Sequence, residues 1–252
     1  MDRRTCLRSL GVAGIAGVAG GHEAVPGVGA ERADGAVLAQ PDNPFNEAMA
    51  HPIYGEEVPS FSLENLEGEE ITPEKFEGER AFLITFIYTK CNDDACPALV
   101  QQLQFVQQTA RDEGFDDDVA FLAVTFDPER DTPEVLREFG DVQRVDHEAD
   151  NWHFLRPESY DEAKEVANGQ FGVGIDRIDM DDDDHGDNGH DDNGHDHDHE
   201  YHFAHSNLIL LVNKNGIVER AYPTRDTLED QEKFLDDPQV LADDLEEVVE
   251  GS

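Results

Sequence analysis

Basic residues are scarce in this chain. Its 252 residues include 18 Lys and Arg against 59 Asp and Glu, which gives a formal net charge of -41. A surface this rich in carboxylates repels polyanions, so the composition excludes nucleic acid as a partner. The acidic residues are spread along the whole chain, which is typical of halophilic proteins, whose hydrated carboxylates keep them dispersed in concentrated, screening salt.

Cysteine is rarer still, with three residues in the chain. Cys6 lies close to the N-terminus, before the expected folded domain. Cys91 and Cys96 are therefore the only two thiols of that domain, and their placement carries more information than their number.

The beginning of the chain lacks an apolar run long enough for a membrane-spanning helix. Arg3 and Arg4 precede an apolar stretch over residues 10–19, which is about half of the roughly 20 residues that a bilayer requires. Paired arginines before such a stretch predict a twin-arginine export signal over residues 1–30, removed on export; a plain basic N-terminus is the alternative. An exported protein would act at the outer face of the cytoplasmic membrane or be secreted, in a more oxidising compartment.

The rest of the chain divides into a linker and one domain. Residues 31–57 are rich in Gly, Ala and Pro and show no sustained periodicity, which predicts a flexible linker. Residues 58–250 are long enough to form a single domain with its own core. Alternation and a central turn over residues 61–71 predict a small hairpin at its start.

Buried strands alternate with helices in the first half of the domain. Residues 81–88 and 119–126 are almost continuously apolar, the pattern of strands covered on both faces. Residues 97–113 carry an apolar stripe at helical spacing, and Thr132 and Pro133 supply the N-cap and first position of a second helix. The alternation predicts an α/β fold with a central mixed sheet flanked by helices.

The second half is interrupted by a low-complexity segment. Residues 179–202 consist largely of Asp, His, Gly and Asn, which cannot build a core, so we predict a disordered, exposed insertion. Residues 207–212 and 217–222 then predict two antiparallel strands joined by an Asn-Gly-type turn. Residues 227–250 indicate an acidic terminal helix, with Pro238 as a point of interruption.

The two domain cysteines are expected to converge where a strand meets a helix. Cys91 follows the strand over 81–88 and Cys96 opens the next helix. A helix N-terminus favours a thiolate at Cys96, whereas Asp93 and Asp94 oppose it unless one of them serves as the N-cap. Two such thiols support either disulfide exchange, as a redox pair, or capture of a soft metal ion.

A third ligand would separate these two chemistries. His205 precedes the strand over 207–212, which in a sheet of this kind runs beside the strand that ends near Cys91. Two thiolates and one imidazole make a three-coordinate set suited to Cu(I) and adaptable to Cu(II).

Three motifs follow one another along the chain. They are the strand end over 86–91 with Cys96-Pro97, the segment Asp127-Pro128-Glu129-Arg130-Asp131-Thr132-Pro133, and His205-Ser206 before a strand and turn. In this order they resemble the SCO/SenC family of copper chaperones. The resemblance covers roughly residues 59 to 222.

The resemblance implies a thioredoxin-like fold with copper bound by Cys91, Cys96 and His205. It also implies a protein that delivers copper to, or reduces the thiols of, the copper A site in subunit II of cytochrome c oxidase. Proximity to the membrane would then come through the partner. Any enzymatic activity would be thiol-disulfide exchange, secondary to the chaperone role.

The sequence departs from the family pattern at three places. Four residues separate the cysteines where the family usually has three, and Ala204 stands where many members have Asp. Loss of that carboxylate removes a hydrogen-bond acceptor that would orient the imidazole. The third departure is the insertion itself.

Two aspartates of the second motif are expected to be structural. Asp127 and Asp131 lie in a strand-to-helix turn, where a carboxylate would cap the helix and Arg130 would pair with a neighbour. A role near the metal is the alternative.

Six histidines of the insertion form a candidate secondary metal site. Imidazole binds Cu(II), Ni(II) and Zn(II), and the interleaved aspartates add charge. The segment could collect copper beside His205, or it could be a tolerated surface expansion. Its histidines are His185, His190, His195, His197, His199 and His202.

Three other functions compete with a copper chaperone. An extracytoplasmic thiol-disulfide oxidoreductase needs no metal, but such enzymes have two residues between their cysteines and a cis-proline where this chain has Ala204-His205-Ser206. A peroxiredoxin-like peroxidase would require a peroxidatic Thr/Cys motif that the sequence lacks. A metal buffer acting through the insertion would retain its ions after loss of both cysteines.

Overall fold

A computed structural model describes residues 32–41, 50–91, 94–179, 201–224 and 237–252. The predicted export signal over 1–30 and residues 180–200 of the insertion lie outside these ranges.

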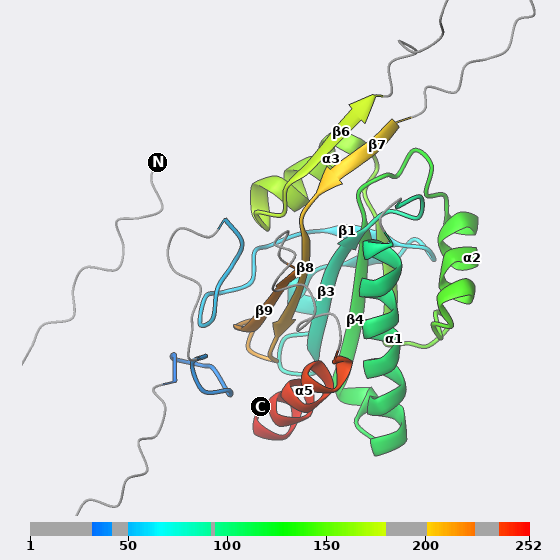
Figure 1. The fold of residues 1–252 in the computed structure, drawn as a ribbon. Helices are drawn as coiled ribbons and strands as arrows, with labels where there is room; N and C mark the ends of the chain where they lie inside the picture. The colour runs from blue at the N-terminus through cyan, green and yellow to red at the C-terminus, as the bar shows by residue number, and fades with distance from the viewer. Residues whose placement is uncertain (1–31, 42–49, 92–93, 180–200, 225–236) are drawn as a thin grey trace, which may run out of the picture. The chain divides into compact units, whose positions relative to one another are not determined.

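The core of the fold is a seven-stranded mixed sheet (Figure 1). Its strand order is β2-β1-β5-β4-β3-β8-β9, with β3, β4 and β5 parallel and the other neighbours antiparallel. The predicted mixed sheet is confirmed. The strands are β1 (Leu63–Asn65), β2 (Glu70–Ile71), β3 (Ala81–Ile87), β4 (Val119–Thr125), β5 (Trp152–Arg156), β8 (Asn207–Val212) and β9 (Val218–Thr224).

The two central strands are apolar because both of their faces are covered. Every residue of β3 and of β4 is buried. Burying such a run stabilises the fold by roughly 1.5–3 kcal/mol for each large apolar side chain, before the entropic cost of ordering the chain. The sheet centre is therefore the most rigid support that the fold offers.

Helices pack against the central sheet. α1 (Ala95–Glu113) packs on β3, β4 and β8 and against α5 (Pro238–Gly251), so the two helices share one face (Figure 1). α2 (Pro133–Gln143) begins as predicted, with the Thr132 hydroxyl accepting from the amide of Val135.

Two predicted helices begin at other residues in the structure. α1 starts two residues before the predicted Pro97, and α5 starts at Pro238, where Asp237 caps it by accepting from the amide of Gln239. Proline at the first helical position costs no hydrogen bond, which is why Pro238 opens the helix instead of interrupting it. Residues 227–236 of the predicted helix lie outside the described residues.

A separate hairpin stands beside the main sheet. β6 (Ile175–Asp179) and β7 (Tyr201–His205) pair only with each other among the described strands, and they extend away from the main sheet in Figure 1. They follow α3 (Tyr160–Lys164) and a π-helical turn over Glu165–Gln170. Residues 179, 201 and 202, at the two ends of the predicted insertion, therefore differ from a disordered loop, because they belong to paired strands in which Asp179 lies opposite Tyr201.

Part of the range predicted as a flexible linker packs on the domain. Leu38 is 1% exposed, and the amides of Val37 and Leu38 donate to the Glu219 carboxylate at 2.6 and 3.0 Å. Gly55 donates its amide to the Val218 carbonyl at 2.8 Å. Composition alone did not indicate this, because the partner that holds the segment is one carboxylate far along the chain.

We expect Glu219→Gln to loosen this attachment. Glu219 is fully buried, and its two oxygens accept from Val37, Leu38 and the side-chain amide of Asn213. Glutamine would place an N–H group against one of these donors, at a cost of about 1–3 kcal/mol in the free energy of unfolding. Urea denaturation measures this change in the free energy of unfolding, and the exposed Glu64→Gln is the control. An equal loss of stability in both variants would contradict the role of Glu219 in holding the segment.

Candidate metal centre

The two cysteines lie where the central strand β3 gives way to α1. Cys91 is half-buried in the connecting loop and Cys96 is fully buried in the first turn of the helix. Both are thiols, not joined in a disulfide. Asp94, one of the two expected N-cap residues, occupies the N-cap position with a left-handed φ of 60°, but its side chain makes no capping hydrogen bond.

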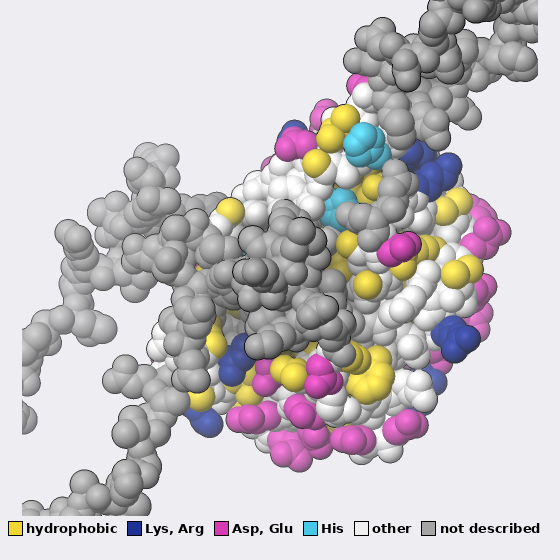
Figure 2. Space-filling model, in the orientation of Figure 1, with side chains coloured by type: hydrophobic (Ala, Val, Ile, Leu, Met, Phe, Trp, Pro, Cys, Tyr) yellow, Lys and Arg dark blue, Asp and Glu magenta, His cyan; other side chains and the backbone are white. Residues whose placement is uncertain are grey.

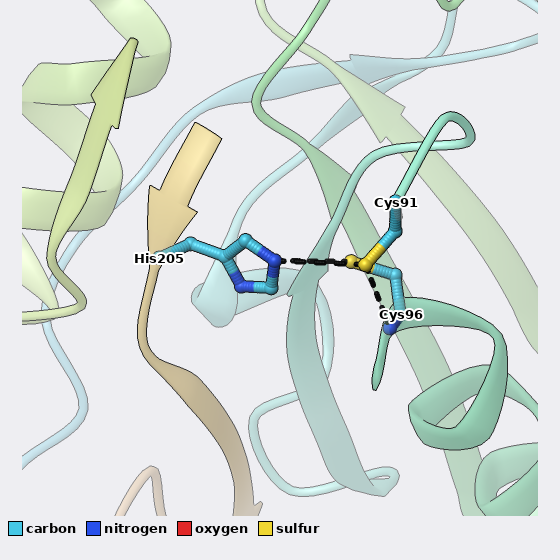
Figure 3. Close-up of side chains that lie close together, drawn as sticks. All are labelled: Cys91, Cys96 and His205. Atoms are coloured by element: carbon cyan, nitrogen blue, oxygen red, sulfur yellow. Dashed lines mark hydrogen bonds between the residues drawn. The ribbon is translucent and has the colours of Figure 1, made fainter. Parts of the chain in front are cut away.

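The third predicted ligand reaches this loop from the other half of the chain. His205 ends β7, one residue before β8, and β8 pairs antiparallel with β3. Figure 3 shows the His205 ring pointing at both sulfur atoms. Its Nε2 lies 3.6 Å from the Cys91 Sγ and 3.9 Å from the Cys96 Sγ, and all three atoms lie within 4.8 Å of one another.

These distances match those of a shared metal ion. Protein bonds of about 2.3 Å from metal to sulfur and about 2.0 Å from metal to nitrogen, at trigonal or tetrahedral angles, hold sulfur and nitrogen about 3.5–3.7 Å apart. The observed separations of 3.6 and 3.9 Å require only a small adjustment. Soft thiolates with one imidazole favour Cu(I).

Backbone amides support negative charge on both sulfurs. The Cys96 amide donates to the Cys91 Sγ at 3.4 Å, and the Tyr88 amide donates to the Cys96 Sγ at 3.5 Å. Hydrogen bonds to the charged form of a group favour that form, and the thiolate is both the metal ligand and the nucleophile. The loop is therefore arranged for metal binding or for thiol exchange.

Aromatic side chains surround the imidazole. The ring centroids of Tyr88 and Phe126 lie 5.5 and 5.3 Å from that of His205, and Phe203 contacts both of these rings at 5.1 Å. Such packing limits the rotation of the imidazole and keeps water from that side of the site. The sequence analysis did not identify these residues, although Phe203 and His205 share one face of β7 by alternation.

Asp131 anchors the loop that carries Cys91. Its carboxylate accepts from the Thr89 amide at 3.2 and 3.3 Å, and from the hydroxyls of Thr89 and Thr125 at 2.5 Å each. The predicted helix-capping role is wrong, because the Thr132 hydroxyl caps α2 instead. The predicted pairing of Arg130 with a neighbour is present, at 2.5 Å from Asp127.

Burial raises the pKa of Asp131 to about 6, although hydrogen bonds from Thr125 and Thr89 act in the opposite direction and the nearby Asp127 adds to the increase. The Asp131 side chain is therefore held in the core by the hydrogen bonds it accepts, although burial disfavours its charged form.

Most of the predicted secondary metal site lies outside the described residues. His185, His190, His195, His197 and His199 lie outside the described residues. His202 is half-buried on β7, and it alternates with His205 along the strand, so it does not join the three-ligand group.

Side chains of several kinds lie on the face that Figure 2 shows. Histidine side chains lie among hydrophobic ones in its upper half, with Lys, Arg and some acidic side chains nearby, and Asp and Glu gather most densely along its lower edge. Within the described part of the chain, no helix has the length and apolar character to cross a membrane.

Comparison with known proteins gives the family. Residues 54–237 match the model of the SCO1/SenC family. The chain belongs to the SCO1/SenC family. The match includes both cysteines, the 127–133 motif and His205, so all three motifs of the sequence analysis fall within it.

Relatives and solved structures agree with this membership. A SCO2-like protein from Rickettsia prowazekii is 27% identical over 158 residues, covering 62% of this chain and 64% of the relative. The alignment thus spans less than two thirds of that relative. ScoI of Bradyrhizobium japonicum, solved with copper bound, is 22% identical, covers 76% of this chain and 99% of its own, and has a TM-score of 0.54.

A plant structure supports the same fold. ScoI of Arabidopsis thaliana, also solved with copper bound, is 20% identical with a TM-score of 0.54, covering 77% of this chain and 99% of its own. The predicted thioredoxin-like fold of SCO1/SenC proteins is confirmed.

We expect Asp131 to give the stability a distinct pH dependence. Its pKa is raised in the folded state, so the folded chain holds this proton more tightly and the contribution of Asp131 to stability falls as pH rises from about 4 through 6. Unfolding free energy of the parent minus that of Asp131→Asn should decrease by up to about 3 kcal/mol over this range.

Denaturant titrations at fixed salt over this pH range measure the difference. Exposed Asp112→Asn is the control for the loss of one aspartate from the surface. A difference between the parent and Asp131→Asn that does not change with pH would show that this carboxylate has no raised pKa in the folded protein.

Proposed function

We propose that this protein binds copper through Cys91, Cys96 and His205 outside the cytoplasm and serves the assembly of cytochrome c oxidase. In this role it delivers copper to, or reduces the thiols of, the copper A site in subunit II. The observation that carries the proposal is the convergence of two sulfurs and one imidazole nitrogen within 4.8 Å.

The chemistry of the three donors favours copper as the cargo. Two thiolates match soft Cu(I), and the imidazole allows the same site to accept Cu(II). Family membership adds support, and two of the similar structures were solved with copper bound.

The difference in burial between the cysteines suggests how cargo is exchanged. Cys91 is half-buried, whereas Cys96 is fully buried in the first turn of α1. An acceptor thiol can approach the Cys91 side first and replace it, while Cys96 and His205 still hold the ion. If the task were instead to restore oxidised acceptor thiols, the more accessible Cys91 would attack the acceptor's disulfide, form the mixed disulfide and release one acceptor thiol, and Cys96 would then displace the second.

The proposed location follows from the start of the chain. A twin-arginine signal over residues 1–30 would export the folded protein to the outer face of the cytoplasmic membrane or beyond. Copper A sites of cytochrome c oxidase require their thiols reduced, and an oxidising compartment makes a chaperone with its own dithiol useful there.

Anaerobic titration of the full chain with Cu(I) and Cu(II), read by competition with a chelator of known affinity, tests the proposal. We expect Cys91→Ser, Cys96→Ser and His205→Ala each to weaken the tight site by at least about tenfold, or about 1.4 kcal/mol, because each removes one of three donors.

His147→Ala serves as the matched control. This histidine contacts Asp141 at 3.1 Å and is not part of the three-ligand group, so copper binding should equal that of the parent. If His205→Ala also binds as the parent does while the thiols still exchange disulfides, an oxidoreductase without an obligatory metal becomes the better description.

We further propose that the histidines of the insertion collect additional copper. Deleting residues 181–199 should lower the number of copper ions bound per chain and leave one thiol-dependent site. Metal analysis after gel filtration measures this number, and the deletion combined with Cys91→Ser should lose the remaining site. An unchanged number would support a tolerated surface expansion.

A further inference from the structure

The ligand His205 is carried by an element with few attachments. β7 pairs with β6 alone among the described strands, and these two strands are separated by residues 180–200 in the sequence. The pairing is therefore not held by a tight two-residue turn. Contacts between this hairpin and the 127–131 turn must help to fix where the imidazole lies.

A stack of three side chains joins the hairpin to that turn. The guanidinium carbons of Arg130 and Arg177 lie 3.6 and 3.5 Å from the centroid of the Tyr201 ring. Two groups this close to one centroid must occupy opposite faces of the ring. Tyr201 of β7 is thus held between an arginine of the turn and an arginine of β6; we call these three residues the Arg-Tyr-Arg stack.

Hydrogen bonds fix the position of Tyr201 within the stack. The Tyr201 hydroxyl donates to Asp127 at 2.7 Å, and Arg130 donates to the other oxygen of that carboxylate at 2.5 Å. Arg130 also donates to the Tyr201 carbonyl at 2.9 Å. Both the side chain and the backbone of Tyr201 are therefore fixed to the turn that follows β4.

The charges of the stack are balanced and mostly shielded from water. Asp127 is 2% exposed and Tyr201 is 7% exposed. Arg177 forms ion pairs with Glu129 at 3.0 Å and Asp179 at 3.5 Å, which offset the second cation. Cation–π contacts that are withdrawn from water are stronger than exposed ones, so the stack can determine the position of the strand.

Tyr201 and His205 are linked by strand geometry. They lie four residues apart on the same face of β7, with Phe203 between them against Tyr88 and Phe126. A strand held at Tyr201 and packed at Phe203 leaves the His205 side chain little freedom relative to the loop of Cys91 and Cys96.

We propose that the Arg130, Tyr201 and Arg177 stack is the positioning device of the metal centre, which sets copper affinity by holding His205 against the two cysteines. The inference rests on the proposed copper site. Arg130, Tyr201 and Arg177 are not among the three candidate ligands, so they act through the placement of β7.

The test compares Tyr201→Leu, Tyr201→Phe and Arg177→Gln with the parent full chain. Tyr201→Leu removes both stacking contacts and the hydrogen bond, and should weaken Cu(I) binding by about ten- to a hundredfold, the usual effect of losing an outer partner of a ligand. Tyr201→Phe keeps the ring between the two arginines and should retain most of the affinity. Arg177→Gln should fall between the two.

A spectroscopic readout separates positioning from general stability. In the Cu(II) form, the nitrogen coupling of the imidazole in the electron paramagnetic resonance spectrum should weaken in Tyr201→Leu, while the sulfur-to-copper charge-transfer band persists. In the metal-free protein, the amides of Phe203 and His205 should exchange hydrogen faster than in the parent.

Tyr222→Phe is the matched control. The Tyr222 hydroxyl also donates to a carboxylate, Asp244, at 2.7 Å with Arg220 nearby at 3.6 Å, but it joins β9 to α5. It should lower stability without changing copper affinity. Parent-like affinity and nitrogen coupling in folded Tyr201→Leu and Arg177→Gln would overturn the inference. A parent that fails to bind copper would overturn the proposed function instead, and the amide exchange would still decide the role of the stack.

Discussion

The antiparallel pairing of β3 with β8 is the interaction on which the site depends. It places strands from the first and last thirds of the chain side by side in the buried centre of the sheet, from Phe82 opposite Val212 to Thr85 opposite Ile209. The dithiol loop leaves one end of β3, and the histidine enters β8 at the same end. Two neighbouring cysteines and a histidine 114 residues after Cys91 therefore meet at one end of the buried central strands.

How far the sequence predicted this arrangement depends on the range of the interactions involved. Continuous apolar runs identified β3 and β4, and Thr132 with Pro133 marked α2, because these signals are local. Residues that depend on distant partners were missed or misread: Asp131 binds Thr89 and Thr125 and does not cap a helix, and Tyr201 acts through Arg130 and Arg177. Nothing in a single sequence tells which distant side chains will meet.

The many carboxylates of this chain affect the metal centre differently with and without a bound ion. Carboxylates near a site of two thiolates would raise the cost of its negative charge, whereas a bound cation would gain from them. The structure surrounds His205 with the aromatic rings of Tyr88 and Phe126, and it commits the nearby Asp127 and Asp131 to arginine, tyrosine and threonine donors. Asp127 and Asp131 are thus engaged by donors within the protein, whereas Asp94, which is exposed, lies two residues before Cys96.

The register of the hairpin also bears on how this chain could have acquired its insertion. Asp179 lies directly opposite Tyr201, so the backbone departs from the hairpin and returns to it at adjacent points. Residues added between them leave every cross-strand pair below unchanged, including the one that contains His205. The length and composition of residues 180–200 can therefore change while the strand register that places His205 is kept.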